Sequence, residues 1–195
     1  IGVDTDRFRP APDGRTGRAA LGVGVVARLK RWEIAARAAR DAGWSFRLVG
    51  PTPDGPYAEE LRSLGPGVEL LGEVTDEELR KEFGRADVLL HPSRVEVLAG
   101  TVLQGLASAL PVLGAEPVAD LVEPGVTGWT TPARAPDDEV YGSFVEWLGR
   151  LSDPQLRRTM GAAARISAET RFSWESVVRA HVTLYEDVFG AAARP

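Results

Sequence analysis

The sequence predicts an α/β fold in which a doubly wound parallel sheet is followed by helices. Short apolar runs rich in β-branched residues alternate with segments of helical spacing, and the connections between them are short. Beyond Pro136 the pattern changes to helix only. We therefore expect one domain over residues 1–195, with a helical tail over about 137–195.

Each element has its own signal. Gly43 ends the first helix, Gly50 and Pro51 end the second strand, and Thr75 with Glu78 forms a capping box. Pro154 suits a first helical turn, and Ser173 suits the cap of the last helix. We expect strands at 21–27, 46–49, 68–71, 86–91, 112–115 and 128–131. We expect helices at 34–42, 57–64, 76–83, 101–109, 138–152, 154–170 and 174–189.

Composition excludes several classes of function. The 23 basic and 28 acidic residues give a net charge of −5, which argues against a nucleic-acid polymer as partner. The absence of Cys excludes disulfides and thiolate metal sites, and two His argue against a His-based zinc centre. Gly22 and Gly24 do not form a dinucleotide-binding fingerprint. No apolar window is long enough to span a membrane, and we expect a soluble protein in a reducing compartment.

The segment PSRVEVLAGTVLQ, which begins at Pro92, follows the most apolar of the predicted strands. Ligands of open parallel sheets bind at the carboxyl ends of strands, so we expect this turn to line a crevice. A helix beginning near Gly100 would direct the free amides of Leu98 to Thr101, and the positive end of its dipole, toward a phosphate. Glu96 and Gln104 lie on the same rim and would bond sugar hydroxyls. The combination predicts a nucleotide-sugar site.

Seven segments of the sequence, taken in order, resemble the carboxyl-terminal, donor-binding domain of retaining GT-B glycosyltransferases of the group 1, family 4 type. The resemblance covers nearly the whole chain and is carried by IGVDTDRFRP, VVARL, LLGEVTDEEL, ADVLLHPSRVE, VLQGLASALPV, LVEPGVTGW and FSWESVVRAHVTLYEDV. It implies a Rossmann-like fold that forms one GT-B half, a nucleotide-diphosphate sugar as donor substrate, and no cofactor or metal. It also implies a cytoplasmic protein, which at full length could lie against a membrane face.

The first residues match the segment that leaves the interdomain linker of that family. The chain also begins with Ile, and we expect it to be a piece of a longer protein. The resemblance then implies an amino-terminal acceptor domain as partner, with an unknown acceptor, and an isolated domain that is inactive. In the family the last helix packs on the partner domain, so Val177, Leu184 and Val188 are expected to be partly uncovered here.

The family's donor motif assigns roles to individual residues. By resemblance, Glu96 is the catalytic residue that holds the transferred sugar near its reacting carbon, and Gln104 takes the ribose hydroxyls. The amides of Leu98, Ala99, Gly100 and Thr101 bind the diphosphate, and backbone near Val74 contacts the base. The sequence departs from the motif, because Val97, Leu98 and Ala99 replace Gly-Phe-Gly and Gln104 replaces a second acid.

The basic residues of the donor site depart further from the family pattern. By resemblance Arg28 contacts the pyrophosphate, whereas Glu33 stands at the usual Lys position, so Lys30 or Arg31 would fill in. The loops after Arg28 and after Val112 are both shorter than in the family, and Pro117 replaces a Gly pair. These changes leave a second hypothesis open, a degenerate GT-B module that keeps the fold, and with it nucleotide affinity or a structural role, without catalysis.

Each candidate also has a structural interpretation. Glu96 could be a solvated loop acid, and Gln104 an exposed helix residue. Arg28 could be the partner of a surface ion pair. We interpret His91 as a buried imidazole with a hydrogen-bond partner, and the five Trp as mostly packing residues.

Overall fold

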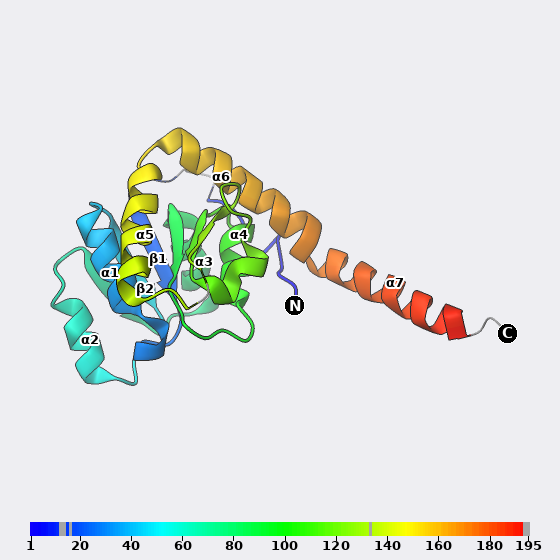
Figure 1. Cartoon of the computed structure of the whole chain (residues 1–195), viewed down its shortest axis with the longest axis horizontal. Coiled ribbons are helices and arrows are strands. Elements are labelled where there is room, and N and C mark those ends of the chain that lie inside the picture. Colours follow the sequence, from blue (N-terminus) through cyan, green and yellow to red (C-terminus); the bar gives the residue numbers. More distant parts are fainter. Residues whose placement is uncertain (12–14, 16, 133, 193–195) are drawn as a thin grey trace.

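The computed structural model describes residues 1–11, 15, 17–132 and 134–192 and confirms the α/β fold (Figure 1). In this part of the chain one sheet contains six strands in the order β3-β2-β1-β4-β5-β6, and every neighbouring pair is parallel. The strands are β1 Ala19–Val23, β2 Ser45–Val49, β3 Val68–Gly72, β4 Val88–His91, β5 Val112–Gly114 and β6 Gly128–Thr130.

The central strands are apolar because helices cover both of their faces. Val88, Leu89 and Leu90 of β4 are almost completely buried. Their side chains alternate between the two sides of the sheet, since Leu89 belongs to one core cluster and Leu90 to the other. A continuous apolar run is therefore the sequence pattern of a strand buried on two sides.

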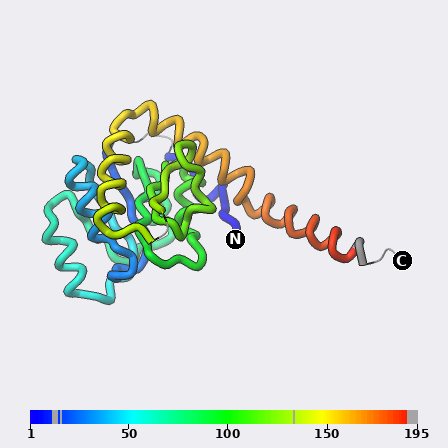
Figure 2. Tube along the Cα trace, in the orientation of Figure 1, coloured from blue at the N-terminus to red at the C-terminus, as the bar shows by residue number. Residues whose placement is uncertain are grey.

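Two helical layers flank the sheet. One core cluster joins residues of α1 Trp32–Asp41, α2 Gly55–Arg62 and α5 Asp137–Arg150 with one face of the sheet. The other joins α3 Asp76–Arg85, α4 Gly100–Ala107 and Ala164 of α6 Pro154–Ser167 with the opposite face. The doubly wound arrangement expected from the sequence is confirmed (Figure 2).

Polar side chains fix several helix starts as predicted. The Thr75 hydroxyl accepts a hydrogen bond from the Glu78 amide, and the Glu78 carboxylate accepts one from the Thr75 amide, which completes the capping box. Ser173 accepts from the Ser176 amide at 3.2 Å at the start of α7 Trp174–Ala192. Pro154 occupies the first turn of α6 after the N-cap Asp153.

Most element boundaries fall within a few residues of expectation, and three of the differences have an evident structural cause. The first strand ends at Val23 rather than Ala27, because Gly24 turns the chain with a φ of 152° and a 3-10 turn, η1 Arg28–Lys30, follows. The fourth strand begins at Val88, because Ala86 caps α3 and the Asp87 carboxylate accepts from the Ala19 amide. The sixth helix continues into a π-helical segment, η3 Ala168–Phe172, before α7 begins. The sequence pattern did not predict the 3-10 segment η2 Glu116–Leu121.

The last helix projects away from the body of the molecule (Figure 1). The segment just before it, η3, is attached to the amino-terminal segment, since the Val3 amide donates to the Phe172 carbonyl at 2.8 Å. Leu184 and Val188 are exposed and Val177 is half-buried, so the expected uncovering of this helix is confirmed. Within the described ranges, no helix is both long and apolar enough to cross a bilayer.

Candidate functional site

The strand order places a crevice where the sequence analysis expected it. β1 lies in the middle of the sheet, the chain winds outward to β3, and then returns to β4 on the other side of β1. The connections after β1 and β4 therefore leave in opposite directions, and a gap opens between the carboxyl ends of these strands. Val23 ends β1 and His91 ends β4 at this position.

A cavity of about 360 Å³ occupies this position. Its walls come from the end of β1, from η1, from the end of β4 with its following loop, and from the first turns of α4. The lining residues are Val23, Gly24, Val25, Lys30, His91, Glu96, Leu98, Gly100, Thr101 and Gln104. The structure thus brings together six of the nine residues predicted for the site, namely Lys30, Glu96, Leu98, Gly100, Thr101 and Gln104.

Glu96 lies at the centre of a three-residue polar cluster. Its Oε2 accepts from Lys30 Nζ at 2.8 Å and contacts His91 Nε2 at 2.9 Å. An ionised carboxylate can only accept, so Nε2 of His91 carries the proton in this contact. All three side chains are largely buried, with exposed fractions of 15% for Lys30, 14% for Glu96 and 3% for His91. The imidazole of His91 is buried and hydrogen-bonded as expected, and its partner is a predicted site residue.

This environment fixes the charge of Glu96. The hydrogen bond from His91, followed by the hydrogen bond and charge of Lys30, lowers the pKa of Glu96 to about 2, although partial burial opposes the shift. The carboxylate is therefore ionised throughout the physiological pH range. A fixed negative charge next to one ammonium group can accept hydrogen bonds from neutral hydroxyls that enter the cavity.

The start of α4 differs in detail from the prediction. The helix begins at Gly100, as expected, but the Gly100 amide donates to the Leu98 carbonyl at 2.8 Å and is not free. The Val102 amide donates to the Ala99 carbonyl at 2.9 Å. Thr101 and Gln104 line the cavity on one face of the helix, as their spacing predicted. The dipole of α4 still directs its positive end at the cavity.

Arg28 lies away from the cavity. Its guanidinium pairs with Glu60 of α2 at 2.8 Å and lies over the Tyr57 ring at 4.8 Å from the centroid. In this conformation the side chain lies toward α2 and does not line the cavity. The bonds to Glu60 hold the pKa of Arg28 above its usual range.

Val74 and Ala99 also lie outside the lining of the cavity. Val74 follows β3 at the sheet edge and packs against the core cluster on the α3 and α4 side. Ala99 is the buried N-cap residue of α4. Glu33, at the position where the family has Lys, bonds the Tyr57 hydroxyl. Burial and this bond raise the pKa of Tyr57 above its usual range.

The sequence did not indicate that Arg31 holds the loops around the cavity in place. Arg31 is buried, donates from Nε to the Pro92 carbonyl at 2.6 Å, and pairs with Asp137 at 3.1 Å. These contacts tie η1, which carries Lys30, to the loop that carries Glu96. From the sequence, Lys30 and Arg31 could be recognised only as two basic residues. The fold of the loop places Lys30 in the cavity, whereas Arg31 holds the two loops together.

Comparisons with known proteins agree with this geometry. The family model described as "Glycosyl transferases group 1" matches residues 20–149. The D-inositol 3-phosphate glycosyltransferase of Streptomyces griseus is 29% identical over 229 aligned residues, which cover 94% of this chain and 47% of the relative. The sulfoquinovosyl transferase SQD2 of Arabidopsis thaliana is 31% identical over 127 residues, covering 63% of this chain and 24% of the relative. The chain thus spans at most about half the length of these relatives.

Solved structures share the fold at low identity. The carboxyl-terminal domain of LpcC, a group 1 glycosyl transferase family protein of Francisella tularensis, superposes with a TM-score of 0.76 at 18% identity, and the match covers 89% of this chain and all of that domain. Anabaena Alr3699/HepE, solved with UDP and glucose, gives a TM-score of 0.75 at 20% identity, covering 97% of this chain and 55% of HepE. The chain belongs to the group 1 glycosyl transferase family and has the Rossmann-like fold of one GT-B half.

Proposed function

We propose that this chain is the donor-binding half of a glycosyltransferase that transfers a sugar from a nucleoside-diphosphate sugar to an acceptor with retention of configuration. The observation that carries the proposal is the single cavity at the β1 and β4 ends, which combines the start of α4, the ammonium of Lys30, and the oxygens of Glu96 and Gln104. Family membership and relatives named as glycosyltransferases support the reaction class.

The diphosphate is assigned to the start of α4 and to Lys30. The helix dipole and the amide of Thr101 favour negative charge there, and Lys30 is the basic residue whose ammonium lines the cavity. Lys30 already pairs with Glu96, so an entering diphosphate would take over part of this pair. Related structures are described as complexes with UDP, and this supports a nucleoside diphosphate as the ligand class.

Glu96 is assigned to the transferred sugar. In the reaction, the bond between the anomeric carbon and the diphosphate oxygen breaks, and its electron pair stays with the diphosphate. Lys30 stabilises this charge, and the ionised carboxylate of Glu96 accepts from sugar hydroxyls and stabilises positive charge at the ring. The acceptor oxygen forms the new bond and gives its proton to the departing diphosphate oxygen. No cofactor and no metal are part of the proposal, and the acceptor domain would come from an amino-terminal half.

A degenerate module without catalysis remains the second hypothesis. It is favoured by the position of Arg28, whose guanidinium is paired with Glu60, and by Glu33, which bonds Tyr57 where the family has Lys. Such a module would bind a nucleotide weakly and would not transfer the sugar. Both hypotheses place the nucleotide in the same cavity, and they differ in whether the sugar is transferred.

The test is a calorimetric and NMR titration of UDP, GDP and ADP against the wild type, Lys30→Met and Glu96→Gln. We expect wild-type binding with a Kd on the order of 0.1 to 1 mM. Lys30→Met should raise Kd about 10-fold, because it removes a charge-assisted contact and leaves Glu96 to repel the phosphates. Glu96→Gln should lower Kd for these sugar-free nucleotides, because it removes that repulsion and frees Lys30.

The chain offers a matched control, Lys81→Met. Lys81 is an exposed lysine on α3 that pairs with Glu77 and does not line the cavity. It should bind nucleotides like the wild type. Equal affinities of the Lys30 and Lys81 variants, or shifts that map away from Thr101 and Gln104, would overturn the phosphate assignment.

A further inference from the structure

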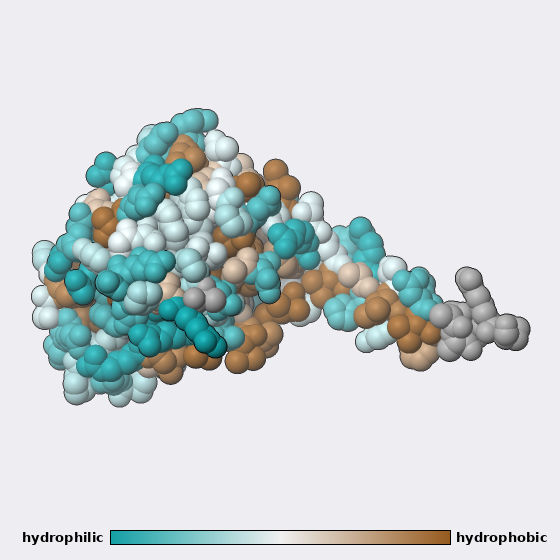
Figure 3. Space-filling model, in the orientation of Figure 1, coloured by the Kyte–Doolittle hydropathy of each residue, from teal (hydrophilic) through white to brown (hydrophobic). Residues whose placement is uncertain are grey.

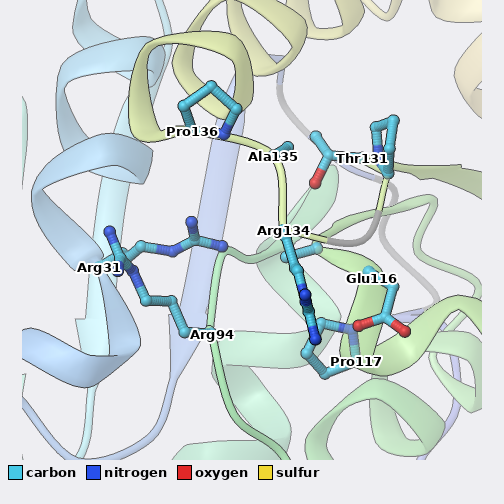
Figure 4. Close-up of a pocket in the computed structure, with 10 residues that line it drawn as sticks. Arg31, Arg94, Glu116, Pro117, Thr131, Arg134, Ala135 and Pro136 are labelled. Atoms are coloured by element: carbon cyan, nitrogen blue, oxygen red, sulfur yellow. The ribbon is translucent and has the colours of Figure 1, made fainter.

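A second cavity, of about 360 Å³, lies next to the crevice and shares no lining residue with it. The loops after β4, β5 and β6 and the start of α1 form its walls. Arg31 and Arg94 lie on one side, Arg134 and Glu116 lie on the other, and Thr131 belongs to the loop after β6 (Figure 4). We call the cavity lined by these five residues the arginine cavity.

Positive charge dominates the arginine cavity. Arg94 bonds both carboxylate oxygens of Asp137, at 2.7 and 2.8 Å, and Arg31 bonds the same carboxylate at 3.1 Å. Burial raises the pKa of Asp137, but the hydrogen bonds and charges of Arg94 and Arg31 leave the pKa below its usual range. Arg134 makes no ion pair with any residue that the structure describes. With Glu116 and Asp137 included, one positive charge is uncompensated.

Thr131 gives an independent indication of a ligand. It is 3% exposed, and its hydroxyl has no hydrogen-bond partner among the described residues. A buried hydroxyl without a partner costs about 1 to 3 kcal/mol, so such a group is normally satisfied by protein or by a bound molecule. Figure 4 shows this hydroxyl on the side of the loop that faces Arg134.

We propose that the arginine cavity binds a phosphate monoester of a small polyhydroxylated molecule, such as a sugar phosphate. Arg94 and Arg134 bond the phosphate oxygens, since a guanidinium matches a phosphate with two parallel hydrogen bonds. The Thr131 hydroxyl donates to the phosphate or to an ester oxygen. Glu116 would repel a bare anion, so the phosphate lies away from it. The neutral hydroxyls of the ligand lie on the Glu116 side of the cavity, because they can donate hydrogen bonds to its carboxylate.

The size of the cavity agrees with this class of ligand. Small-molecule sites usually have volumes of roughly 300 to 1,000 Å³, and a phosphate ion alone would fill only a small part of such a space. Because the two cavities share no lining residue, this ligand and a nucleoside diphosphate bind at the same time. The proposal does not depend on the function proposed for the crevice.

Calorimetry and 31P NMR at constant ionic strength test the site, with glucose 6-phosphate, inorganic phosphate and glucose as probes. We expect glucose 6-phosphate to bind with a Kd on the order of 1 mM, inorganic phosphate to bind about 10-fold more weakly, and glucose not to bind. Saturating UDP should leave these values unchanged. Competition by UDP would overturn the proposal, and equal binding of phosphate and glucose 6-phosphate would overturn the sugar assignment.

Two variants separate binding from folding. Arg134→Asn removes the guanidinium but tolerates the φ of 61° at this position, and Thr131→Val removes the hydroxyl with almost no change of shape. Both should raise the Kd for glucose 6-phosphate at least fivefold. Thr131→Val should also keep or raise Tm without ligand, because it removes an unsatisfied buried hydroxyl.

The matched control is Arg179→Gln on the projecting helix, where the arginine pairs only with Glu175 in the described part of the chain. It should bind glucose 6-phosphate like the wild type. If Arg134→Asn and Thr131→Val also bind like the wild type, the arginine cavity is not the site.

Discussion

At position 96 a carboxylate lies between an ammonium and an imidazole, and this arrangement makes stability depend on pH. The pKa of Glu96 falls from 4.5 to about 2 through the bond from His91 and the contact with Lys30. Because the folded-state pKa is below the unfolded value, the ionised group stabilises the fold above pH 4.5, and this contribution is lost as the pH falls through about 2. The stability therefore rises with pH over this range, as expected for a carboxylate that is paired in the native state.

We predict that Glu96→Gln loses stability relative to the wild type at pH 7 and that the difference shrinks between pH 4.5 and pH 2. Denaturant unfolding of both proteins at several pH values measures this difference. Glu146→Gln is the control, because Glu146 is an exposed residue on α5 with a 3.8 Å pair to Arg150, and its difference should stay small. A Glu96 difference that is the same at pH 7 and at pH 2 would contradict the ionised cluster.

The residues of the site could be predicted only in part from the sequence. Spacing within one helix placed Thr101 and Gln104 on a common face, because helical geometry is local. The choice between Arg28, Lys30 and Arg31 could not be predicted, because it depends on a 3-10 turn and a left-handed Arg31 with a φ of 55°. Tertiary partners far along the chain, Glu60, Glu96 and Asp137, decide which side chain enters the cavity.

At the scale of elements, β1 and β2 are each followed by a glycine, and Gly50 after β2 lies against the backbone of Gly24 after β1. A Cβ on Gly50 would lie 2.1 Å from the Gly24 carbonyl oxygen, and Gly50 has a φ of 147°. Alternating strands and helices predicted the sheet, since burial on two sides dictates apolar runs. The end of β1 was placed too late, because 25–27 is as apolar as the strand itself and only the turn at Gly24 separates them.

We predict that Gly50→Ala destabilises the protein by about 3 kcal/mol, since a backbone carbonyl cannot move aside cheaply. Gly142→Ala is the control, because Gly142 lies in α5 with no atom near its Cβ position. That change should stabilise the protein by about 0.5 to 1 kcal/mol. Urea unfolding gives both values. A neutral Gly50→Ala would contradict the close approach at the crevice edge.

The projecting α7 has an apolar side that the body does not cover. Val178, Val182, Leu184, Tyr185, Val188 and Phe189 are exposed, and Figure 3 shows hydrophobic surface along this helix. The pattern of the sequence predicted the helix but could not show where it lies relative to the sheet, because amphipathic spacing does not identify the covering surface. The exposure agrees with the expectation, implied by the family resemblance, that the last helix packs on an amino-terminal domain.

We predict that a chain ending at Val177 keeps the Tm of the longer chain to within about 2 °C, because the removed turns bury little apolar area. The capping contacts of Ser173 and the bond from Val3 to Phe172 are kept in that variant. Thermal unfolding followed by circular dichroism measures Tm, and light scattering should show less self-association. A large loss of Tm would mean that α7 packs on the body in solution.

At the scale of the whole molecule, the crevice is open on one side. Four apolar residues at its rim, Leu29, Val95, Val97 and Leu98, are exposed, with 89% exposure at Val97. Monomeric proteins rarely leave such groups together in water, and exposed apolar patches mark interaction sites. The proposed function accounts for this patch, because it places an amino-terminal acceptor domain opposite the crevice.

We therefore predict that this chain alone binds nucleoside diphosphates but forms no glycoside. Half of a cleft neither holds an acceptor in line with the sugar nor excludes water from the reacting carbon, and positioning alone can supply about 7 to 11 kcal/mol of the barrier. The assay incubates the chain with UDP-, GDP- and ADP-sugars and a panel of acceptors that includes inositol 3-phosphate, with product followed by mass spectrometry. The full-length Streptomyces griseus relative is the positive control. Steady product formation by the chain alone would show that these residues contain a complete active site.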